Sequence, residues 1–188
     1  FEFSLAMASI SDAVIGDYNY MFDPRAFLRR FFEEPSSHIA LIDEAHNLYD
    51  RACEMYSASL SKEPIQELKR LFKDRHKGLS KSLANLNMKF IEYRHELEEK
   101  KVFDLFKEDM DLSFLNRAQD LLDVLEKYLY QHQDTEYKPQ LMNLYFELHQ
   151  FLRISDYFNE SFRVRYERFG IEVKVSIVCL NPSLYLSE

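Results

Sequence analysis

The chain has 188 residues, 46% of them hydrophobic and 30% charged, a composition typical of a folded protein with a buried core. Its formal net charge of −8 argues against broad electrostatic binding to nucleic acid or to an anionic membrane, although a local basic groove stays compatible with it. The two cysteines are too few for a four-thiolate site, and no apolar run approaches the ~18 residues of a membrane span.

Residues 1–58 have the pattern of an α/β layer. We expect a helix over Leu5–Ile10, a short buried strand over Asp12–Tyr18, and a helix over Pro24–Phe32 with its proline in the first turn. A second strand is expected over His38–Glu44, because four apolar residues follow one another there, as in a strand covered on both faces of a parallel sheet. A further helix should begin at Ala45.

Residues 59–160 carry apolar side chains at spacings of three and four, the pattern of amphipathic helices. Gly78 and Pro139 are expected near breaks between these helices. Four such helices with short connections are predicted to pack as an antiparallel bundle. Their apolar stripes are Ile65, Leu68 and Phe72; Leu79, Leu83, Leu86, Phe90, Tyr93 and Leu97; Phe114, Ala118, Leu121, Leu125 and Tyr128; and Leu141, Leu144, Leu148, Phe151 and Phe158.

Residues 161–188 change to an alternation of period two on either side of Gly170, which predicts a β-hairpin. The sequence therefore predicts an α+β fold that is predominantly α. In this fold an antiparallel helical bundle is inserted between short strand-containing segments of one α/β layer.

The stretch Asp43-Glu44-Ala45-His46 follows the expected second strand and has the form of a Walker B motif. At the carboxyl end of a strand, the first acid can hold Mg²⁺, and the second can orient or deprotonate the water that attacks the γ-phosphate of ATP. Asp43 and Glu44 are thus the candidate metal ligands, Glu44 is the candidate catalytic base, and His46 is a candidate for coupling hydrolysis to movement. The alternative is a pair of acids at a helix start beside a surface histidine.

Three stretches make the sequence resemble the XPD/DinG-like branch of superfamily 2 DNA helicases, which move 5′ to 3′ on single-stranded DNA. ISDAVIGDYNYMFDP (10–24) is similar to the strand and loop before motif II of that family. IALIDEAHNLYDRA (39–52) is similar to motif II itself, and CLNPSLYLSE (179–188) to the segment that leads towards motif III. The family inserts a helical arch domain between the last two, where this sequence predicts the bundle.

The resemblance implies three parts: a P-loop-type motor-lobe segment (1–58), an arch domain (59–160) and a hairpin that returns to the motor lobe (161–188). It also implies ATP and Mg²⁺ as cofactors, single-stranded DNA as partner, and a 4Fe–4S cluster in the parent protein. The chain has no G-K-[S/T] phosphate loop and none of the cluster cysteines, since Cys53 and Cys179 fall outside that pattern. We therefore expect an excised piece of a helicase that hydrolyses no ATP alone. The expected location is the bacterial cytoplasm, with the nucleoid, or a eukaryotic nucleus.

Further residues are candidates for contacts with DNA. Tyr18, Asn19 and Tyr20 can stack on bases or bond phosphates, or the two tyrosines can simply complete strand packing. The basic residues are either a DNA path or the solvated face of a helix and a hairpin. They are Lys69, Arg70 and Lys73 in the first bundle helix and Arg163 and Arg165 in the hairpin.

A second function class stays open from the residues alone. The chain can be an independent helical-bundle interaction module in which Asp43-Glu44-Ala45-His46 is coincidental. The two hypotheses differ in whether Glu44 matters for ATP turnover.

Overall fold

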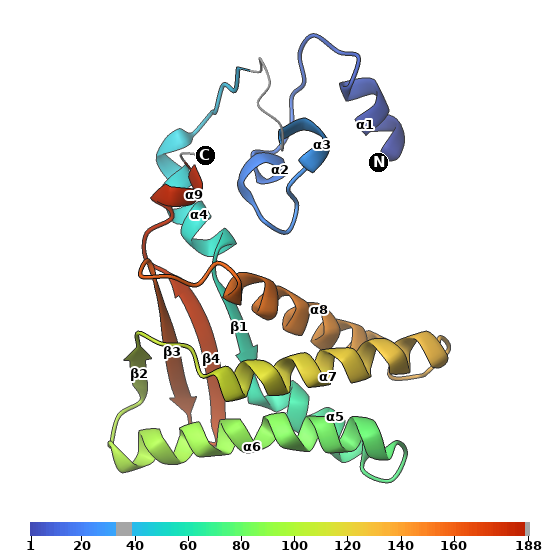
Figure 1. Ribbon diagram of the computed structural model, residues 1–188, viewed down its shortest axis with the longest axis vertical. Helices are drawn as coiled ribbons and strands as arrows, with labels where there is room; N and C mark the ends of the chain where they lie inside the picture. Colours follow the sequence, from blue (N-terminus) through green and yellow to red (C-terminus); the bar gives the residue numbers. More distant parts are fainter. Residues whose placement is uncertain (33–38, 187–188) are drawn as a thin grey trace.

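The computed structural model describes residues 1–32 and 39–186, and its main body is a helical bundle packed against a four-stranded sheet (Figure 1). The fold is α+β and predominantly α, as predicted. The four expected bundle helices are all present: α5 (Lys62–Phe72), α6 (Lys77–Glu99), α7 (Leu112–Gln131) and α8 (Lys138–Ser155).

The sheet is antiparallel throughout, with strand order β1-β4-β3-β2. Its centre is the predicted hairpin, in which Gly170 turns with a φ of 64° and Val164 lies opposite Ile177. A positive φ is a conformation that glycine adopts without steric cost. The strands are β1 (Ala58–Ser61), β2 (Asp104–Lys107), β3 (Phe162–Phe169) and β4 (Glu172–Cys179).

The sheet and the bundle share one hydrophobic core. Alternate residues of β3 and β4 point towards the helices, where the apolar stripes of α5 to α8 are also buried. Burial of this apolar surface is the main stabilising contribution to the fold. Fully buried side chains include Leu60, Ile65, Phe72, Leu83, Phe90, Phe114, Leu148, Phe151, Phe162 and Ile177.

The ends of the bundle helices follow local sequence signals. His76 accepts a hydrogen bond from the Leu79 amide at the start of α6, and Asp111 accepts one from the Phe114 amide at the start of α7. Gly78 and Pro139 are each the second residue of a helix, close to the breaks that the sequence predicts. Proline is tolerated there because the first helical N–H groups have no partner within the helix.

The remaining described segments form short helices beyond the sheet, in the upper part of Figure 1. They are α1 (Glu2–Ala8), α2 (Asn19–Phe22), α3 (Arg29–Phe32), the 3₁₀ helix η1 (Ala45–Asn47), α4 (Leu48–Met55) and α9 (Ser183–Leu186). Within the described ranges, no helix has the length and apolar character needed to cross a membrane.

Neither of the two strands expected near the N-terminus forms. Residues 12–16 and 39–42 have no regular secondary structure, and His38 lies outside the described residues. A strand needs a neighbour for its N–H and C=O groups, and the four strands of the described sheet leave these two segments unpaired. The strand predictions are therefore wrong for this structure, because the described part of the chain supplies no partner strand for either apolar segment.

The helix expected over Pro24–Phe32 is also wrong in most of its length. The Phe27 amide bonds the Asp23 carbonyl, which closes one turn, but the Leu28 amide then bonds back to the carbonyl of Tyr20. This bond interrupts the i to i−4 ladder that a helix requires. Helical structure resumes only at Arg29.

Candidate nucleotide and nucleic-acid site

The Walker-B-like acids lie on an exposed turn at the start of η1. Asp43 Oδ1 accepts a hydrogen bond of 2.9 Å from the amide of Glu44. The Glu44 carboxylate lies 3.3 Å from His46 Nε2, and both of these side chains are largely in solvent. The turn therefore presents two carboxylates and an imidazole outward, where a nucleotide or metal can reach them.

Glu44 adopts a left-handed backbone conformation, with φ 51° and ψ 35°. For a residue with a Cβ atom this conformation costs about 1–2 kcal/mol, so the surrounding chain must compensate for it. The conformation ends the extended segment before Glu44 and lets η1 and α4 begin directly after it. It thereby sets the direction in which the Glu44 carboxylate leaves the chain.

Helix α4 ties this turn to the sheet. The Tyr49 hydroxyl donates to the carbonyl of Leu180 at 3.1 Å, just beyond the end of β4. The Ser57 hydroxyl donates to the carbonyl of Cys53 at 2.6 Å and accepts from the Cys179 amide at 3.0 Å. The candidate site is therefore anchored to the strand that closes the hairpin, 120 residues and more away in sequence.

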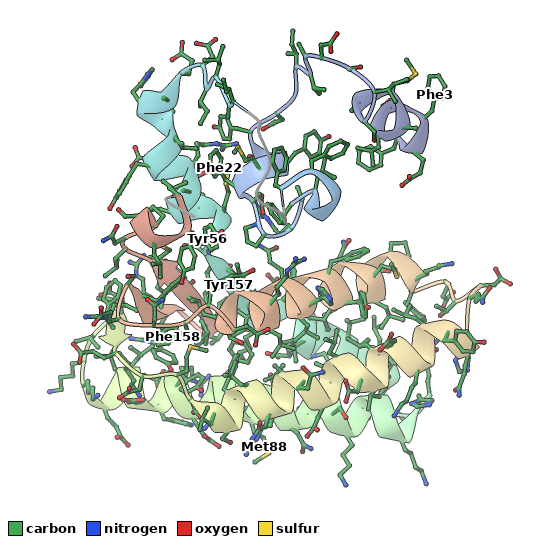
Figure 2. The ribbon with its side chains drawn as sticks, turned by 45° about the horizontal axis from the view of Figure 1, so that its top comes forward. Phe3, Phe22, Tyr56, Met88, Tyr157 and Phe158 are labelled. Atoms are coloured by element: carbon green, nitrogen blue, oxygen red, sulfur yellow. The ribbon has the colours of Figure 1, made fainter. Side chains whose placement is uncertain are left out.

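Three tyrosines extend this anchor. The rings of Tyr56 and Tyr185 stack with centroids 4.3 Å apart, and Tyr157 meets both rings edge-on. The Tyr185 hydroxyl donates to the Tyr157 carbonyl at 2.9 Å and accepts from Asn159 Nδ2 at 2.8 Å. Figure 2 shows Tyr56 and Tyr157 at the junction between α4 and the bundle. Sequence reasoning missed this cluster, because its members are neighbours only in the folded chain.

The acids of the turn fit a magnesium ion as one or two ligands. Mg²⁺ is usually held in nucleotide sites by one or two carboxylates, with phosphate oxygens and water completing its octahedron. Asp43 and Glu44 provide such carboxylates, and among the described residues neither pairs with a lysine or arginine. Within residues 1–32 and 39–186, no group of three histidine, cysteine, aspartate or glutamate side chains could hold a metal by itself. A Mg²⁺ ion held by these two acids would take its remaining ligands from phosphate oxygens and water.

The cysteines do not fit an iron–sulfur cluster. Such a cluster needs four thiolate ligands, and the chain contains only Cys53 and Cys179. Cys179 is buried, and burial raises the pKa of its thiol to about 11, which disfavours the thiolate. Cys53 and Cys179 instead belong to the contact between α4 and β4 described above.

Tyr18, Asn19 and Tyr20 lie together at α2 rather than on a strand. Tyr18 is half-buried against the core. A hydrogen bond with its hydroxyl raises the pKa of the Arg51 guanidinium on α4. Asn19 Oδ1 is buried and has no hydrogen-bond partner in the part of the chain that the structure describes, whereas the Tyr20 ring is partly exposed beside Phe1. The packing explanation therefore suits Tyr18, and Tyr20 has the more accessible ring.

The basic candidates separate into two surfaces. Lys69 and Arg70 lie on α5 and line a pocket against α6, and Lys73 follows at the C-terminal end of α5. Arg163 and Arg165 lie on β3, and both reach acids: Arg163 lies 3.5 Å from Glu108, and Arg165 lies 3.2 Å from Asp104. The structure does not bring these two groups of residues into one pocket.

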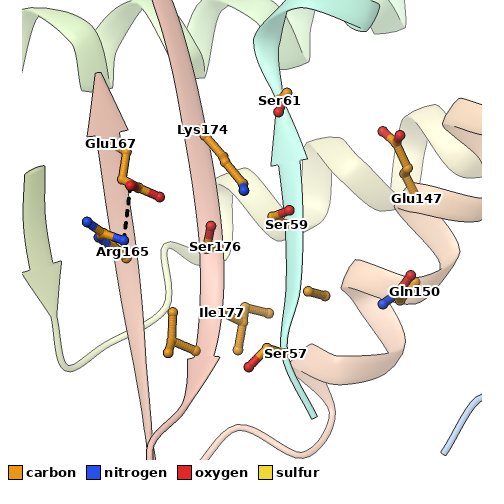
Figure 3. Close-up of a pocket in the computed structure, with 12 residues that line it drawn as sticks. Ser57, Ser59, Ser61, Glu147, Gln150, Arg165, Glu167, Lys174, Ser176 and Ile177 are labelled. Carbon is orange, nitrogen blue, oxygen red and sulfur yellow. Dashed lines mark ion pairs between the residues drawn. The ribbon is translucent and has the colours of Figure 1, made fainter. Parts of the chain in front are cut away.

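Arg165 also forms an ion pair of 3.0 Å with Glu167 on the open side of the sheet (Figure 3). There it lines a shallow pocket of about 450 Å³ with residues of β1, β4 and α8, among them Lys174 and Glu147. The charges of acidic and basic side chains therefore balance one another on this surface. The arginines of β3 are consistent with a solvated, ion-paired sheet face.

Comparison with known protein families gives one finding for the N-terminal part. Residues 1–65 match the DEAD_2 family model. The match contains the Tyr18-Asn19-Tyr20 stretch and Asp43-Glu44-Ala45-His46 and ends within α5, so it covers about a third of the chain. The match supports a relationship between this chain and the DEAD-like helicase superfamily. No curated protein matches the chain.

Proposed function

We propose that this chain carries the Walker B segment and the arch domain of an XPD/DinG-like helicase, which hydrolyses ATP and moves 5′ to 3′ on single-stranded DNA. Asp43 holds Mg²⁺, Glu44 activates the attacking water, and His46 couples nucleotide to DNA. Bound Mg²⁺–ATP supplies the phosphoryl group and the charge that neutralises the transition state. The bundle at residues 59–160 helps to enclose the DNA strand, and residues 161–188 return towards the motor lobe.

The observation that supports this proposal is the DEAD_2 match, because residues 1–65 include both acids. The exposure of the acids adds to it. A carboxylate that only caps a helix would bond the amides of the first turn. Here Asp43 bonds its neighbour, Glu44 faces His46, and η1 starts without a side-chain cap.

The apolar residues before the acids also support a strand that pairs within a larger sheet. The side chain of Ile39 is 90% exposed and that of Leu41 95%, while Ile15 in the other unpaired segment is fully exposed. Contiguous exposed apolar side chains mark surfaces that another structural element covers. We propose that both segments pair with strands of a motor lobe.

By itself the chain is expected to hydrolyse no ATP, because its sequence has no G-K-[S/T] phosphate loop to cradle the β- and γ-phosphates. We further propose that the cluster cysteines, the phosphate loop and the arginine-bearing second lobe belong to the longer helicase. Its location follows its substrate: the nucleoid of a bacterium or the nucleus of a eukaryote.

The decisive experiment replaces Glu44 by Gln in a polypeptide that joins this segment to its phosphate loop. Loss of the general base is expected to lower DNA-stimulated ATP turnover by about 100-fold or more, whereas the affinity for ATP changes little. Turnover is measured by phosphate release, and nucleotide affinity by fluorescence titration. Glu54→Gln is the matched control, because Glu54 is an exposed carboxylate of α4 that pairs with Arg51.

Unchanged turnover in Glu44→Gln would exclude the Walker B assignment. In that case the self-contained core of sheet and bundle would favour the alternative, an independent interaction module. Mg²⁺-dependent ATP turnover by the 188-residue chain alone would contradict the predicted inactivity of the segment.

A further inference from the structure

A pocket between α5 and α6 is lined, among the described residues, by four basic side chains and no acidic one. It has a volume of about 240 Å³ and lies where one face of α5 meets one face of α6. Such a concentration of positive charge is unexpected in a chain with a net charge of −8. The lining residues are Lys62, Gln66, Lys69 and Arg70 from α5 and Asn87, Ile91 and Arg94 from α6.

The basic groups are close enough to repel one another. Lys62 is only 5% exposed, and the pKa of its ammonium is lowered, first by burial and then by the positive charges of Arg94, Arg70 and Lys69. Glu172 opposes this effect but lines no part of the pocket. One N–H of Lys62 Nζ donates to the Ile171 carbonyl at 2.9 Å, which leaves two for another acceptor.

Within residues 1–32 and 39–186, two buried polar atoms of the pocket residues have no hydrogen-bond partner. Asn87 is 4% exposed, and its Oδ1 atom bonds nothing within the described chain. Arg94 Nε likewise finds no hydrogen-bond partner among the described residues, although it lies 3.6 Å from a carboxylate oxygen of Glu98. An unpaired buried polar group costs about 1–3 kcal/mol, so a pocket that retains such groups is suited to a ligand. A 180° rotation of the Asn87 amide would present its NH₂ group to an anion.

We propose that this pocket binds a phosphate group through Lys62, Lys69, Arg70, Arg94 and the amide of Asn87. A tetrahedral phosphate offers several acceptor oxygens, which match the convergent ammonium and guanidinium donors. The volume is below the ~300 Å³ at which pockets for drug-sized ligands begin, so a single phosphate-bearing group fits it. The phosphate belongs either to the backbone of single-stranded DNA or to a small free ion or nucleotide. Only the binding of a DNA-backbone phosphate rests on the proposed function.

The test compares two pocket variants with a charge-matched control. Lys69→Gln/Arg70→Gln removes two charges from the pocket, and Lys77→Gln/Lys81→Gln removes two exposed charges of α6 outside it. Binding of a labelled oligothymidylate of about 10 nucleotides is followed by fluorescence anisotropy over a range of salt concentrations. Because the pocket takes one phosphate, loss of that contact should lower the salt slope by about 0.7 and weaken binding about fivefold near 0.1 M salt.

Asn87→Leu provides the second variant, because it removes an amide without changing the charge. Since Asn87 Oδ1 is unsatisfied, the free protein should keep or gain thermal stability while its anion affinity falls. Titration of inorganic phosphate and of ADP by calorimetry gives the second arm of the experiment. A purely structural role for Asn87 would instead lower stability and leave anion binding unchanged.

The outcomes separate the two phosphate sources. If DNA binding weakens in both pocket variants and not in the control, the backbone phosphodiester is the ligand. If only phosphate or ADP binding weakens, the pocket takes a small free phosphate, and the DNA source is wrong. If neither probe responds to the pocket variants more than to the control, the pocket is not a phosphate site. The Walker B test through Glu44 is unaffected by any of these results.

Discussion

Asp111 connects three groups of the bundle through one carboxylate. Its Oδ1 atom accepts from the Phe114 amide at 3.1 Å and caps α7, while Oδ2 accepts from the Tyr93 hydroxyl at 2.7 Å. The Lys89 ammonium lies 2.8 Å from the same Oδ2 atom. Because Tyr93 is 4% exposed, its hydroxyl would lose its partner inside the core if the carboxylate were removed.

The pKa of Asp111 is lowered in the folded protein. Burial raises it, but the hydrogen bonds from Lys89, Tyr93 and the Phe114 amide outweigh that effect. A carboxyl whose folded pKa lies below its unfolded value of about 3.9 stabilises the protein above that value. This stabilisation is lost as the pH falls through the folded pKa. The acid side of the stability curve should therefore depend on Asp111.

We predict that Asp111→Asn lowers the free energy of unfolding by about 1–3 kcal/mol at pH 7, because hydrogen bonds to a charged group become neutral ones. The difference from the wild type should begin to shrink below about pH 4, where the carboxyl of the unfolded chain becomes protonated, and should disappear as the pH falls through the lowered folded pKa. Urea unfolding followed by circular dichroism from pH 7 to about pH 2.5 measures both effects. The control is Asp109→Asn, an exposed neighbour. A difference that stayed constant over this range would contradict the titration of Asp111.

At the scale of elements, Phe114 is the contact point of three helices. Its ring on α7 lies 5.4 Å from that of Phe90 on α6 and 5.6 Å from that of Phe151 on α8, both near-perpendicular. Edge-to-face pairs of this kind add about 0.5–1.5 kcal/mol beyond the area that they bury. All three rings are at most 1% exposed, so no water can replace a lost ring.

Phe114→Ala is therefore expected to lower the free energy of unfolding by about 3–5 kcal/mol, through lost burial and a residual cavity. The matched control is Phe146→Ala on α8, whose side chain is 58% exposed and which should change stability by less than about 0.5 kcal/mol. Thermal and urea unfolding measure both variants. Equal effects at the two positions would mean that α6, α7 and α8 do not pack through Phe114.

The helices could be predicted from the sequence because their signal is local and repeated. Each apolar stripe recurs over several turns, as in Leu79 to Leu97, and the structure buries those residues. Strand β1 was missed because it has only four residues, although Ala58 and Leu60 alternate with Ser59 and Ser61. Strand β2 was missed because it has only four residues and its partner is distant in sequence: Leu105, which is half-buried, lies opposite Tyr166, 61 residues away.

In the sequence, the residues of the basic pocket form two separate helical patterns. Lys62, Gln66 and Lys69 follow helical spacing on one face of α5, and Asn87, Ile91 and Arg94 do so on α6. Charged residues at that spacing are usually solvated, so only the packing of the two helices shows that the faces meet. The sequence pointed to Lys69 and Arg70, but it could not indicate Lys62, Asn87 or Arg94 as their neighbours.

At the scale of the whole molecule, the chain has two parts that differ in how much they contribute to the hydrophobic core. Residues 55–179 contribute the shared core of sheet and helices, whereas the N-terminal segments meet this core through side chains such as Tyr18 and Phe22. In Figure 2 Phe22 lies near α4, and Phe3 lies further from the bundle. Residues 12–16 and 39–42 have neither helix nor strand to protect their amides.

Hydrogen exchange should separate these parts. Amides of 12–16 and 39–42 are expected to exchange with a free energy of opening close to about 0, because water reaches their N–H groups without unfolding. Amides in the centres of α6 and β4 should exchange only through global unfolding, which costs about 5–15 kcal/mol in a typical domain. Mass spectrometry of peptic peptides resolves both segments from the core. Strand β2 serves as an internal reference, since it is hydrogen-bonded but lies at a sheet edge.

Hydrogen exchange also tests whether Ile39 and Leu41 are exposed because a partner sheet is missing. If another sheet normally pairs with this segment, a polypeptide that includes the motor lobe should protect residues 39–42, because backbone hydrogen bonds then replace water. The 188-residue chain should leave them unprotected, while α6 remains protected in both. Strong protection of 39–42 in the 188-residue chain would mean that the segment finds its partner within the chain or in a second copy. The acids at Asp43 and Glu44 would then be positioned without a motor lobe, contrary to the function that we propose.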